Sequence, residues 1–277
     1  MKYRAVVSDL DGTLLNGEHR FSEKTKEIIK KVKESGRKIF IATGRHHLDA
    51  LKLKKQLGLD SYLISSNGAR IHNEHNEVVY EKNIDKDIVD FILSKECDKN
   101  ISRHVYTEDH WYVEKEREEF KRYHQESGFY YTIKNFDEIE KNKVVKIFFI
   151  SETHIGLQEL ESYFEETLKG KVSITLSGPD CLELMAFNVS KGEAIKNVME
   201  RLNIPLNEVI AFGDGLNDYE MLSEVGKGLL MGNAAERLKA KLPNNEIIEK
   251  NIDDGVAKYL EKNLLSEKMW YREWVYQ

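Results

Sequence analysis

The sequence predicts an α/β protein in which a parallel sheet, covered by helices, is interrupted by a separate α+β unit. Short apolar runs alternate with amphipathic helical segments at both ends of the chain, a pattern typical of parallel strands buried on both faces. Between these stretches, apolar runs flank short polar turns, as in antiparallel hairpins. We therefore expect a core domain from residues 1–82 and 189–277, and an inserted α+β domain from residues 83–188.

The first part of the chain alternates strands and helices. The helix after the first strand has an N-cap at Ser22 and a stop at Gly36. Leucines at helical spacing mark a second helix, which Gly58 ends. The strands expected here are residues 3–8, Lys38–Ala42 and Tyr62–Ser65, followed by a hairpin of Ile71 with Val78–Tyr80.

Helical and extended patterns are mixed between residues 83 and 188. The elements expected there are helices at 84–96, 116–127 and 153–169, strands within 101–114 and at 143–150, and a hairpin from VSITL to CLELM. After residue 188, Ser190 followed by Glu193 is a capping-box pattern for a helix that runs to Leu202. The last elements expected are a strand at Val209–Phe212, a helix at Asp218–Val225, a strand at Gly228–Met231 and a helix at 254–264.

Composition limits the possible functions. Of the 277 residues, 40% are hydrophobic and 32% are charged, which suits a soluble protein with a substantial core. The 42 basic and 48 acidic residues give a net charge of −6, so charge gives no reason to expect nucleic acid as a partner. No stretch approaches the roughly 20 apolar residues of a membrane helix, and the N-terminus lacks the apolar core of a signal peptide. We expect a cytoplasmic protein with no membrane partner, in which Cys97 and Cys181 are free thiols.

A pair of carboxylates, Asp9 and Asp11, directly follows the first predicted strand. Side chains two residues apart on a strand point the same way, and Gly12 lets the chain turn away sharply. Paired carboxylates at the carboxyl end of a strand suit a hard cation and acid–base chemistry. The alternative is an ordinary turn, because Asp and Gly are common turn residues.

Three further segments carry candidate binding groups. After the second predicted strand, the Thr43 hydroxyl and the bare backbone at Gly44 can hold phosphate oxygens, although a Thr-Gly turn is also common without a ligand. Lys191 lies in the first turn of the capped helix, where an ammonium is misplaced unless an anion binds nearby; otherwise it is a solvated lysine. A glycine loop after the strand VIAF carries Asp214 and Asp218, which suit Mg²⁺, but Asp218 can alternatively cap the next helix.

Taken in order, these segments resemble a known family. DLDGTLL, IATGR, Lys191 and GDGLND resemble the four motifs of the haloacid dehalogenase (HAD) superfamily, and SSNGA, VSKGEAI, GDGLNDYEML and MGNA resemble its Cof-type phosphatases. The resemblance covers nearly the whole chain and includes an insert between the second and third motifs, where Cof-type proteins carry a type IIB cap. It implies a Rossmann-like core with an α+β cap, and phosphatase activity on a small phosphorylated metabolite such as a sugar phosphate.

The resemblance also implies a role for each motif residue. Asp9 would attack phosphorus and form an aspartyl-phosphate, while Asp11 would act as general acid and then as general base. Mg²⁺ would be held by Asp9, Asp214 and the backbone carbonyl of Asp11, with Asp218 bound directly or through water. The groups implied to stabilise the phosphate oxygens are Thr43, Lys191, Asn217 and the amides of Leu10 and Gly44.

The insert is the part whose role is least apparent from the sequence. It would close over the phosphate, and the residues that could touch the leaving group are Trp111, Tyr112, His104 and Glu183, with packing or surface exposure as the alternative for each. A phosphomutase of the same superfamily would share the Asp pair. A receiver-type signalling module would share an Asp phosphoacceptor, but on a middle strand and without the insert. We expect a monomer or weak homodimer, and the aromatic tail MWYREWVYQ could pack on the core or form a dimer contact.

Overall fold

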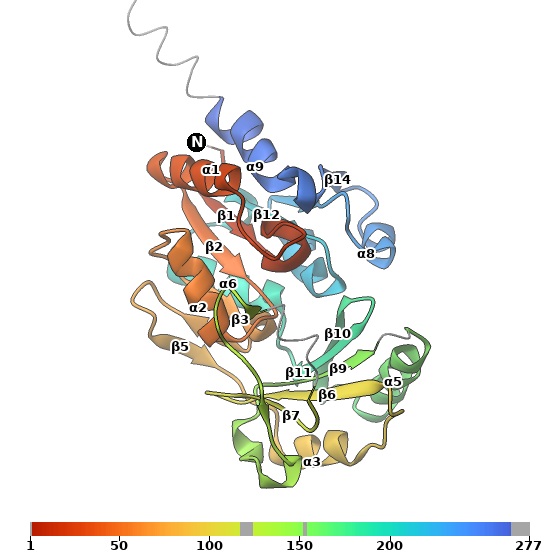
Figure 1. Cartoon of the computed structure of the whole chain (residues 1–277). Helices are drawn as coiled ribbons and strands as arrows, with labels where there is room; N and C mark the ends of the chain where they lie inside the picture. The colour runs from red at the N-terminus through yellow and green to blue at the C-terminus, as the bar shows by residue number, and fades with distance from the viewer. Residues whose placement is uncertain (1, 117–123, 152–153, 267–277) are drawn as a thin grey trace, which may run out of the picture.

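The computed structural model describes residues 2–116, 124–151 and 154–266, and its strands form two β-sheets (Figure 1). The larger sheet has the order β14-β13-β12-β1-β2-β3-β4-β5, and the smaller sheet has the order β10-β11-β9-β6-β7-β8. The larger sheet is parallel from β14 to β3, whereas β4 and β5 are added antiparallel at one edge. The prediction of an α/β fold with a parallel sheet and a second unit of mostly antiparallel strands is confirmed.

Helices cover both faces of the larger sheet. Its strands are β1 (Ala5–Ser8), β2 (Lys38–Ala42), β3 (Leu63–Ser65), β4 (Arg70–His72), β5 (Val78–Glu81), β12 (Val209–Gly213), β13 (Lys227–Leu230) and β14 (Glu246–Ile247). Side chains alternate between the faces, so Val6 packs with α1 (Glu23–Glu34), α2 (His47–Gln56) and α9 (Gly255–Leu260). Its neighbour Val7 packs with the helices of the other face, which are α6 (Lys191–Arg201), α7 (Tyr219–Glu224) and α8 (Glu236–Lys241).

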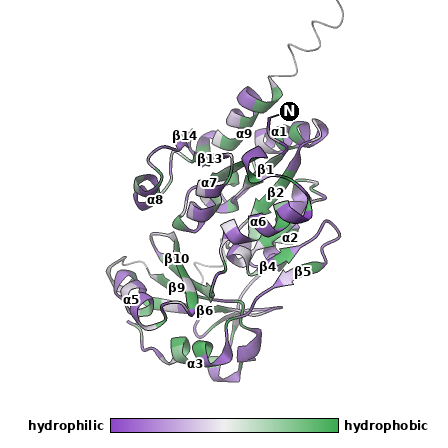
Figure 2. Cartoon of the chain, turned by 180° about the vertical axis from the view of Figure 1, so that it is seen from behind, coloured by the Kyte–Doolittle hydropathy of each residue, from purple (hydrophilic) through white to green (hydrophobic). Residues whose placement is uncertain are grey.

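The smaller sheet has a hydrophobic core of its own. Its strands are β6 (Ile101–Tyr106), β7 (Trp111–Val113), β8 (Thr132–Ile133), β9 (Lys146–Ser151), β10 (Val172–Gly178) and β11 (Cys181–Ala186). Apolar residues of α3 (Lys86–Ser94) and α5 (His154–Thr167) pack against it. The strands are antiparallel except for the β7–β8 pair. In Figure 2, hydrophobic green marks the central strands β1 and β2 of the larger sheet, and the surrounding helices show both green and purple.

Capping residues and hydrophobic patterns in the sequence predicted several helices and strands correctly and missed others. Ser22 accepts a hydrogen bond from the Thr25 amide, and Ser190 accepts one from the Glu193 amide, so both predicted N-caps form. The Glu193 carboxylate pairs with Lys196. Short elements were missed: α8, β14 and the short helices η1 (Leu10–Leu14), η2 (Ser66–Gly68) and η7 (Leu216–Asp218).

Some predicted boundaries shift, and some predictions fall on residues that the structure leaves undescribed. The strand expected from residue 143 starts at Lys146, because Lys141–Lys143 forms a 3₁₀ turn. Most of the helix expected at 116–127 and the whole of the aromatic tail lie outside the described residues. Cys97 and Cys181 are free, as expected. Within the described ranges, no helix is both long and apolar enough to cross a membrane.

Three histidines stack where α2 meets β4. The ring centroids of His46 and His47 lie 4.5 Å apart, and those of His47 and His72 lie 4.8 Å apart. His46 Nδ1 accepts from the Leu48 amide and its Nε2 faces the Thr107 carbonyl, which defines a neutral ring protonated on Nε2. Burial lowers the pKa of His46 to about 3 and the pKa values of His47 and His72 to about 4.

The lowered pKa values of these histidines predict a loss of stability in mild acid. Their folded pKa values lie below the value of about 6.5 for an unfolded chain, so the unfolded state binds more protons as the pH falls from about 6.5 to 4. We expect the free energy of unfolding to decrease as the pH is lowered through this window. In the double variant His47→Gln/His72→Gln, this decrease should be smaller. Urea unfolding at a series of pH values measures both. An unchanged pH dependence in the variant would contradict the prediction.

Candidate active site

The four predicted motifs meet at the carboxyl ends of the parallel strands. Asp9 follows β1, Thr43 follows β2 and Asp214 follows β12, and these three strands are neighbours in the sheet. The Asp9 amide donates to the Phe212 carbonyl at 3.1 Å, which ties the first motif to the last one. Lys191, the first residue of α6, is fully buried beside them. This edge is where open α/β sheets bind their ligands.

Three carboxylates form an acidic triad at this edge. One oxygen from each of Asp9, Asp214 and Asp218 lies within 4.8 Å of the others. Burial raises the pKa of Asp9 to about 7, and burial together with the charges of Asp9 and Asp218 raises the pKa of Asp214 well above its usual value. Clustered, partly desolvated carboxylates of this kind suit a hard divalent cation. The residues present therefore fit the Mg²⁺ ion that the sequence led us to expect.

Gly12 is required for the triad to close. Its φ of 73° lies in the left-handed region, and an added Cβ would come within 2.2 Å of Asp214 Oδ2. On the other side of Asp214, Thr13 Oγ1 donates to Oδ1 at 2.7 Å. The DLDGT segment thus supplies Asp9 and also holds the Asp214 carboxylate in place.

Lys191 is the cation that pairs with two members of the triad, Asp9 and Asp218. Lys191 Nζ lies 2.7 Å from Asp9 Oδ1 and 2.7 Å from Asp218 Oδ1. Burial alone would lower the pKa of Lys191, but Asp218 and Asp9 raise it above its usual value. Asp218 Oδ2 accepts from the amides of Asp214 and Gly215, so Asp218 closes the loop before it rather than capping α7. Lys191 is therefore a buried counter-ion, and the alternative of a solvated lysine is wrong.

Lys191→Met should destabilise the metal-free protein. The buried carboxylates of Asp9 and Asp218 would lose their cation, and breaking a buried ion pair typically costs about 3–5 kcal/mol. We expect urea unfolding in EDTA to show a loss of this order and Mg²⁺ to recover part of it. Lys196→Met, on the exposed side of the same helix, is the matched control and should cost less than about 1 kcal/mol. Equal losses in the two variants would contradict the prediction.

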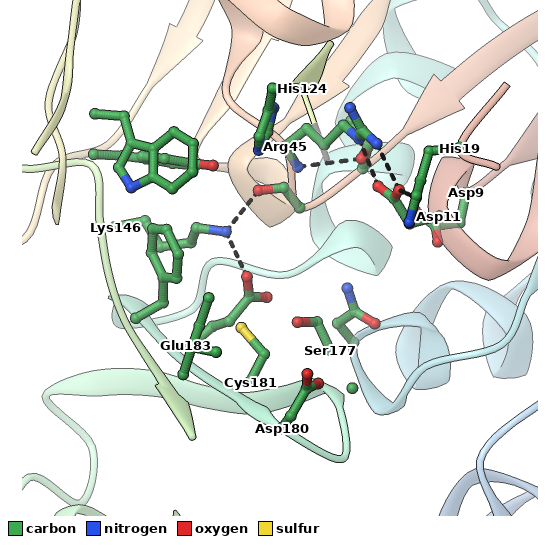
Figure 3. Close-up of a pocket in the computed structure, with 18 residues that line it drawn as sticks. Asp9, Asp11, His19, Arg45, His124, Lys146, Ser177, Asp180, Cys181 and Glu183 are labelled. Atoms are coloured by element: carbon green, nitrogen blue, oxygen red, sulfur yellow. Dashed lines mark hydrogen bonds and ion pairs between the residues drawn. The ribbon is translucent and has the colours of Figure 1, made fainter. Parts of the chain in front are cut away.

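Asp11 makes a different set of contacts from Asp9. Its carboxylate accepts from Arg45 Nε and Nη2, both at 2.6 Å, and lies 3.1 Å from His19 Nδ1 (Figure 3). Burial would raise the pKa of Asp11, but the Arg45 guanidinium holds it well below its usual range. Arg45 is itself held by Asp49 at 2.9 Å. The Asp11 side chain therefore lies outside the acidic triad, although Asp9 and Asp11 line the same cavity.

A cavity of about 260 Å³ opens between these motifs and the smaller sheet. The motif residues that line it include Thr43, Gly44 and Asn217, while the Leu10 side chain is buried beneath. The opposite wall comes from the smaller sheet and from the turn before β8, and its lining includes Tyr106, Trp111, His124, Lys146, Phe148, Cys181 and Glu183. Figure 3 shows Lys146, Glu183 and Cys181 facing the Asp9 and Arg45 side of the cavity.

Of the four residues predicted as possible contacts of the leaving group, two line the cavity and two do not. Trp111 and Glu183 line the cavity, whereas Tyr112 packs against His110 and the buried His104 accepts from the Trp111 indole N–H at 3.0 Å. Sequence reasoning gave no role to Arg45, His19, Asn67 and Lys146. The first two lie inside or just after predicted motifs. Asn67 lies in the SSNGA segment, so the resemblance marked it without giving it a role.

The fold and the acidic site, together with the relatives described next, define the class of protein: a hydrolase of phosphate monoesters, in which the smaller sheet faces a carboxylate-rich pocket. The model of the haloacid dehalogenase-like hydrolase family matches residues 6–260. The chain belongs to this family. An HMP-PP phosphatase of Yersinia pseudotuberculosis is 34% identical over 97% of this chain and 98% of its own.

Solved structures give the same assignment. A haloacid dehalogenase-like hydrolase from B. subtilis superposes with a TM-score of 0.80 at 28% identity, over 94% of this chain and 99% of that one. A sugar phosphatase of HAD subclass IIB superposes with a TM-score of 0.77 at 25% identity, over 94% of this chain and 98% of that one. The expected relation to Cof-type phosphatases with a subclass IIB cap is confirmed, and the protein is a HAD-type phosphatase of small phosphorylated substrates.

Proposed function

We propose that the protein is a Mg²⁺-dependent phosphatase that hydrolyses a small phosphorylated metabolite through an aspartyl-phosphate on Asp9. The observation that carries this proposal is the position of Asp9, which contacts Lys191, belongs to the acidic triad with Asp214 and Asp218, and lines the same cavity as Asp11. A nucleophile and an acid–base group in one cavity are what a two-step phosphoryl transfer requires.

In the first step, an Asp9 oxygen attacks phosphorus and forms an O–P bond while the bond to the leaving oxygen breaks. Asp11 gives its proton to that oxygen. In the second step, water attacks phosphorus, Asp11 takes the proton of the water, and Asp9 is released with inorganic phosphate. The low pKa of Asp11 keeps its carboxylate ionised, which is the form that accepts a proton. In the acid role, the negative charge of a bound phosphate would oppose the effect of Arg45.

The phosphate needs positive charge and hydrogen-bond donors. The residues that would hold Mg²⁺ are Asp9, Asp214 and Asp218, together with the Asp11 carbonyl, and the ion would supply charge that offsets repulsion between Asp9 and the phosphate. Thr43, Asn217, Lys191 and the amides of Leu10 and Gly44 would stabilise the phosphate oxygens. We assign substrate selection to residues 83–188, the proposed cap, because the smaller sheet forms the wall opposite Asp9.

The test is a turnover screen over phosphorylated metabolites that includes sugar phosphates and the substrate named for the Yersinia relative. Release of inorganic phosphate with loss of the ester supports a phosphatase. An isomeric phosphate ester as the main product would instead support the phosphomutase alternative. Failure to hydrolyse every ester, in protein that is folded and supplied with Mg²⁺, would refute the proposal.

A further inference from the structure

A buried ion pair joins two strands of the smaller sheet at the wall of the cavity. Lys146 Nζ on β9 lies 2.5 Å from Glu183 Oε1 on β11, and their side chains are 3% and 4% exposed. The rings of Tyr106 and Phe148 flank the ammonium, with centroids 4.8 and 4.7 Å away. A buried pair of this kind is weak evidence of a stabilising role, because desolvation offsets its attraction. The other hydrogen bonds of Lys146 and Glu183 therefore indicate what the pair does.

Both partners also hydrogen-bond to loops that follow strands of the larger sheet. Lys146 Nζ donates to the Gly44 carbonyl at 2.6 Å, and Glu183 Oε2 accepts from Asn67 Nδ2 at 2.6 Å. Gly44 follows β2 and Asn67 follows β3, so one ion pair contacts two neighbouring loops (Figure 3 shows the Lys146 contacts). A Cβ at Gly44 would lie 3.0 Å from Asn67 Oδ1 and 3.5 Å from each Glu183 oxygen. The glycine thus leaves room for this close approach.

The first contact reaches Thr43. In a trans peptide the carbonyl of Gly44 and the amide of Arg45 point in opposite directions, so a bond from Lys146 fixes the plane of both. The Arg45 amide donates to Thr43 Oγ1 at 3.2 Å. A hydroxyl that accepts this bond still has its own hydrogen to donate to a phosphate oxygen. Lys146 therefore orients one proposed phosphate ligand through a single peptide group.

The second contact reaches Asn217. An ionised carboxylate only accepts hydrogen bonds, so Glu183 selects the Nδ2 side of the Asn67 amide. Asn67 Oδ1 then accepts from Asn217 Nδ2 at 3.1 Å. Asn67 is 1% exposed and has a φ of 55°, a left-handed value that costs energy for a residue other than glycine. The strained backbone places its amide between Glu183 and Asn217.

We infer that Lys146 and Glu183 are positioning residues for the phosphate-binding groups of the core. The pair orients Thr43 through Gly44 and Arg45, and orients Asn217 through Asn67, so the phosphate site is complete when the segment 83–188 is docked. This inference rests on the proposed function for the identity of the ligand. It gives the segment a second task besides contact with the leaving group, namely organising the binding of the phosphate itself.

The test measures binding of inorganic phosphate by calorimetry in the presence of Mg²⁺. The variant Lys146→Met/Glu183→Met removes both contacts without leaving an unpaired buried charge, and such replacements are often neutral for stability. Glu183→Gln keeps an acceptor for Asn67 but removes the charge. Arg237→Ala is the control, because it breaks another ion pair between the two parts of the molecule. Arg237 shares a pocket with Asn67, but it hydrogen-bonds to Glu161 rather than to Gly44 or Asn67. Urea unfolding verifies that each variant is folded.

We expect the double variant to weaken phosphate binding by roughly tenfold, the effect of losing about two orienting hydrogen bonds. Glu183→Gln should lie between the double variant and the wild type, and Arg237→Ala should stay within about twofold of the wild type. For an aryl phosphate, kcat/KM should fall by at least the factor seen in binding. Unchanged phosphate affinity in the folded double variant, or an equal loss in Arg237→Ala, would overturn the inference.

The two proposals can fail separately. Phosphate binding is measured without turnover, so wild-type protein that binds phosphate but hydrolyses no ester would refute the phosphatase proposal while the variants still test the positioning of the ligand. Conversely, an active wild type with an unaffected double variant would refute only the role of Lys146 and Glu183.

Discussion

Asp9→Asn is expected to abolish turnover of every phosphate ester that the wild type hydrolyses. An amide is a far weaker nucleophile than a carboxylate, and removal of a covalent nucleophile lowers kcat by roughly 10⁴-fold or more. Asparagine keeps the size of the side chain and can still accept from Lys191, so the fold should be retained. The measurement is steady-state release of phosphate, together with a search for acid-stable labelling of the protein.

The control for Asp9→Asn is Asp60→Asn, which changes an aspartate whose side chain is 84% exposed. Wild type and control should label and turn over alike. Activity near that of the wild type in pure Asp9→Asn protein would remove Asp9 as the nucleophile. Labelling that persists in the variant would point to a different phosphorylated residue.

Metal removal should be as damaging as loss of the nucleophile. EDTA is expected to reduce turnover to background, because Asp9 and the phosphate would otherwise repel each other across a triad that already carries excess negative charge. Added Mg²⁺ should restore activity and raise the thermal unfolding midpoint, since a ligand that binds the folded state stabilises it. Full activity in protein stripped of divalent ions would contradict the assignment of the triad.

Asp214→Asn is expected to weaken metal binding while it stabilises the metal-free protein. Burial and the charges of Asp9 and Asp218 raise the pKa of Asp214, so the ionised carboxylate is costly in metal-free protein at neutral pH. The variant should therefore unfold at a higher temperature than the wild type in EDTA, yet gain little from Mg²⁺ and turn over poorly. A variant that is less stable than the wild type in EDTA would show that the triad is not electrostatically strained.

The sequence predicts what depends on neighbours in the chain. The cap at Ser190, the turn at Gly12 and the strand before Asp9 depend on a few adjacent residues, and these features were predicted. Contacts between distant residues were not predictable in the same way. Lys146 reaches Gly44 across 102 positions, and Asn67 reaches Glu183 across 116, so no local pattern marks either pair. The motifs could be predicted to lie together because the carboxyl ends of parallel strands meet at one edge of the sheet. This rule concerns topology and does not depend on residue spacing.

The short elements near the C-terminus were missed for a different reason. The segment that forms α8 and β14 has few apolar residues, and its helix and strand are held by packing on β13. The prediction for Asp9 and Asp11 was too simple about the directions of their side chains. Their spacing predicted a shared direction, whereas the chain turns at η1 and gives the two carboxylates different partners.

The central position of β1 has a consequence for how the protein is made. This strand hydrogen-bonds to β2 on one side and to β12 on the other, yet the entire smaller sheet separates β2 from β12 in the chain. As the chain leaves the ribosome, β1 to β5 can assemble early, but one edge of β1 has no partner until β12 emerges. Unpaired strand edges are templates for association between chains. The late arrival of β12, and of Asp214 directly after it, therefore does two things at once: it completes the acidic triad and it pairs an exposed strand edge of the nascent protein.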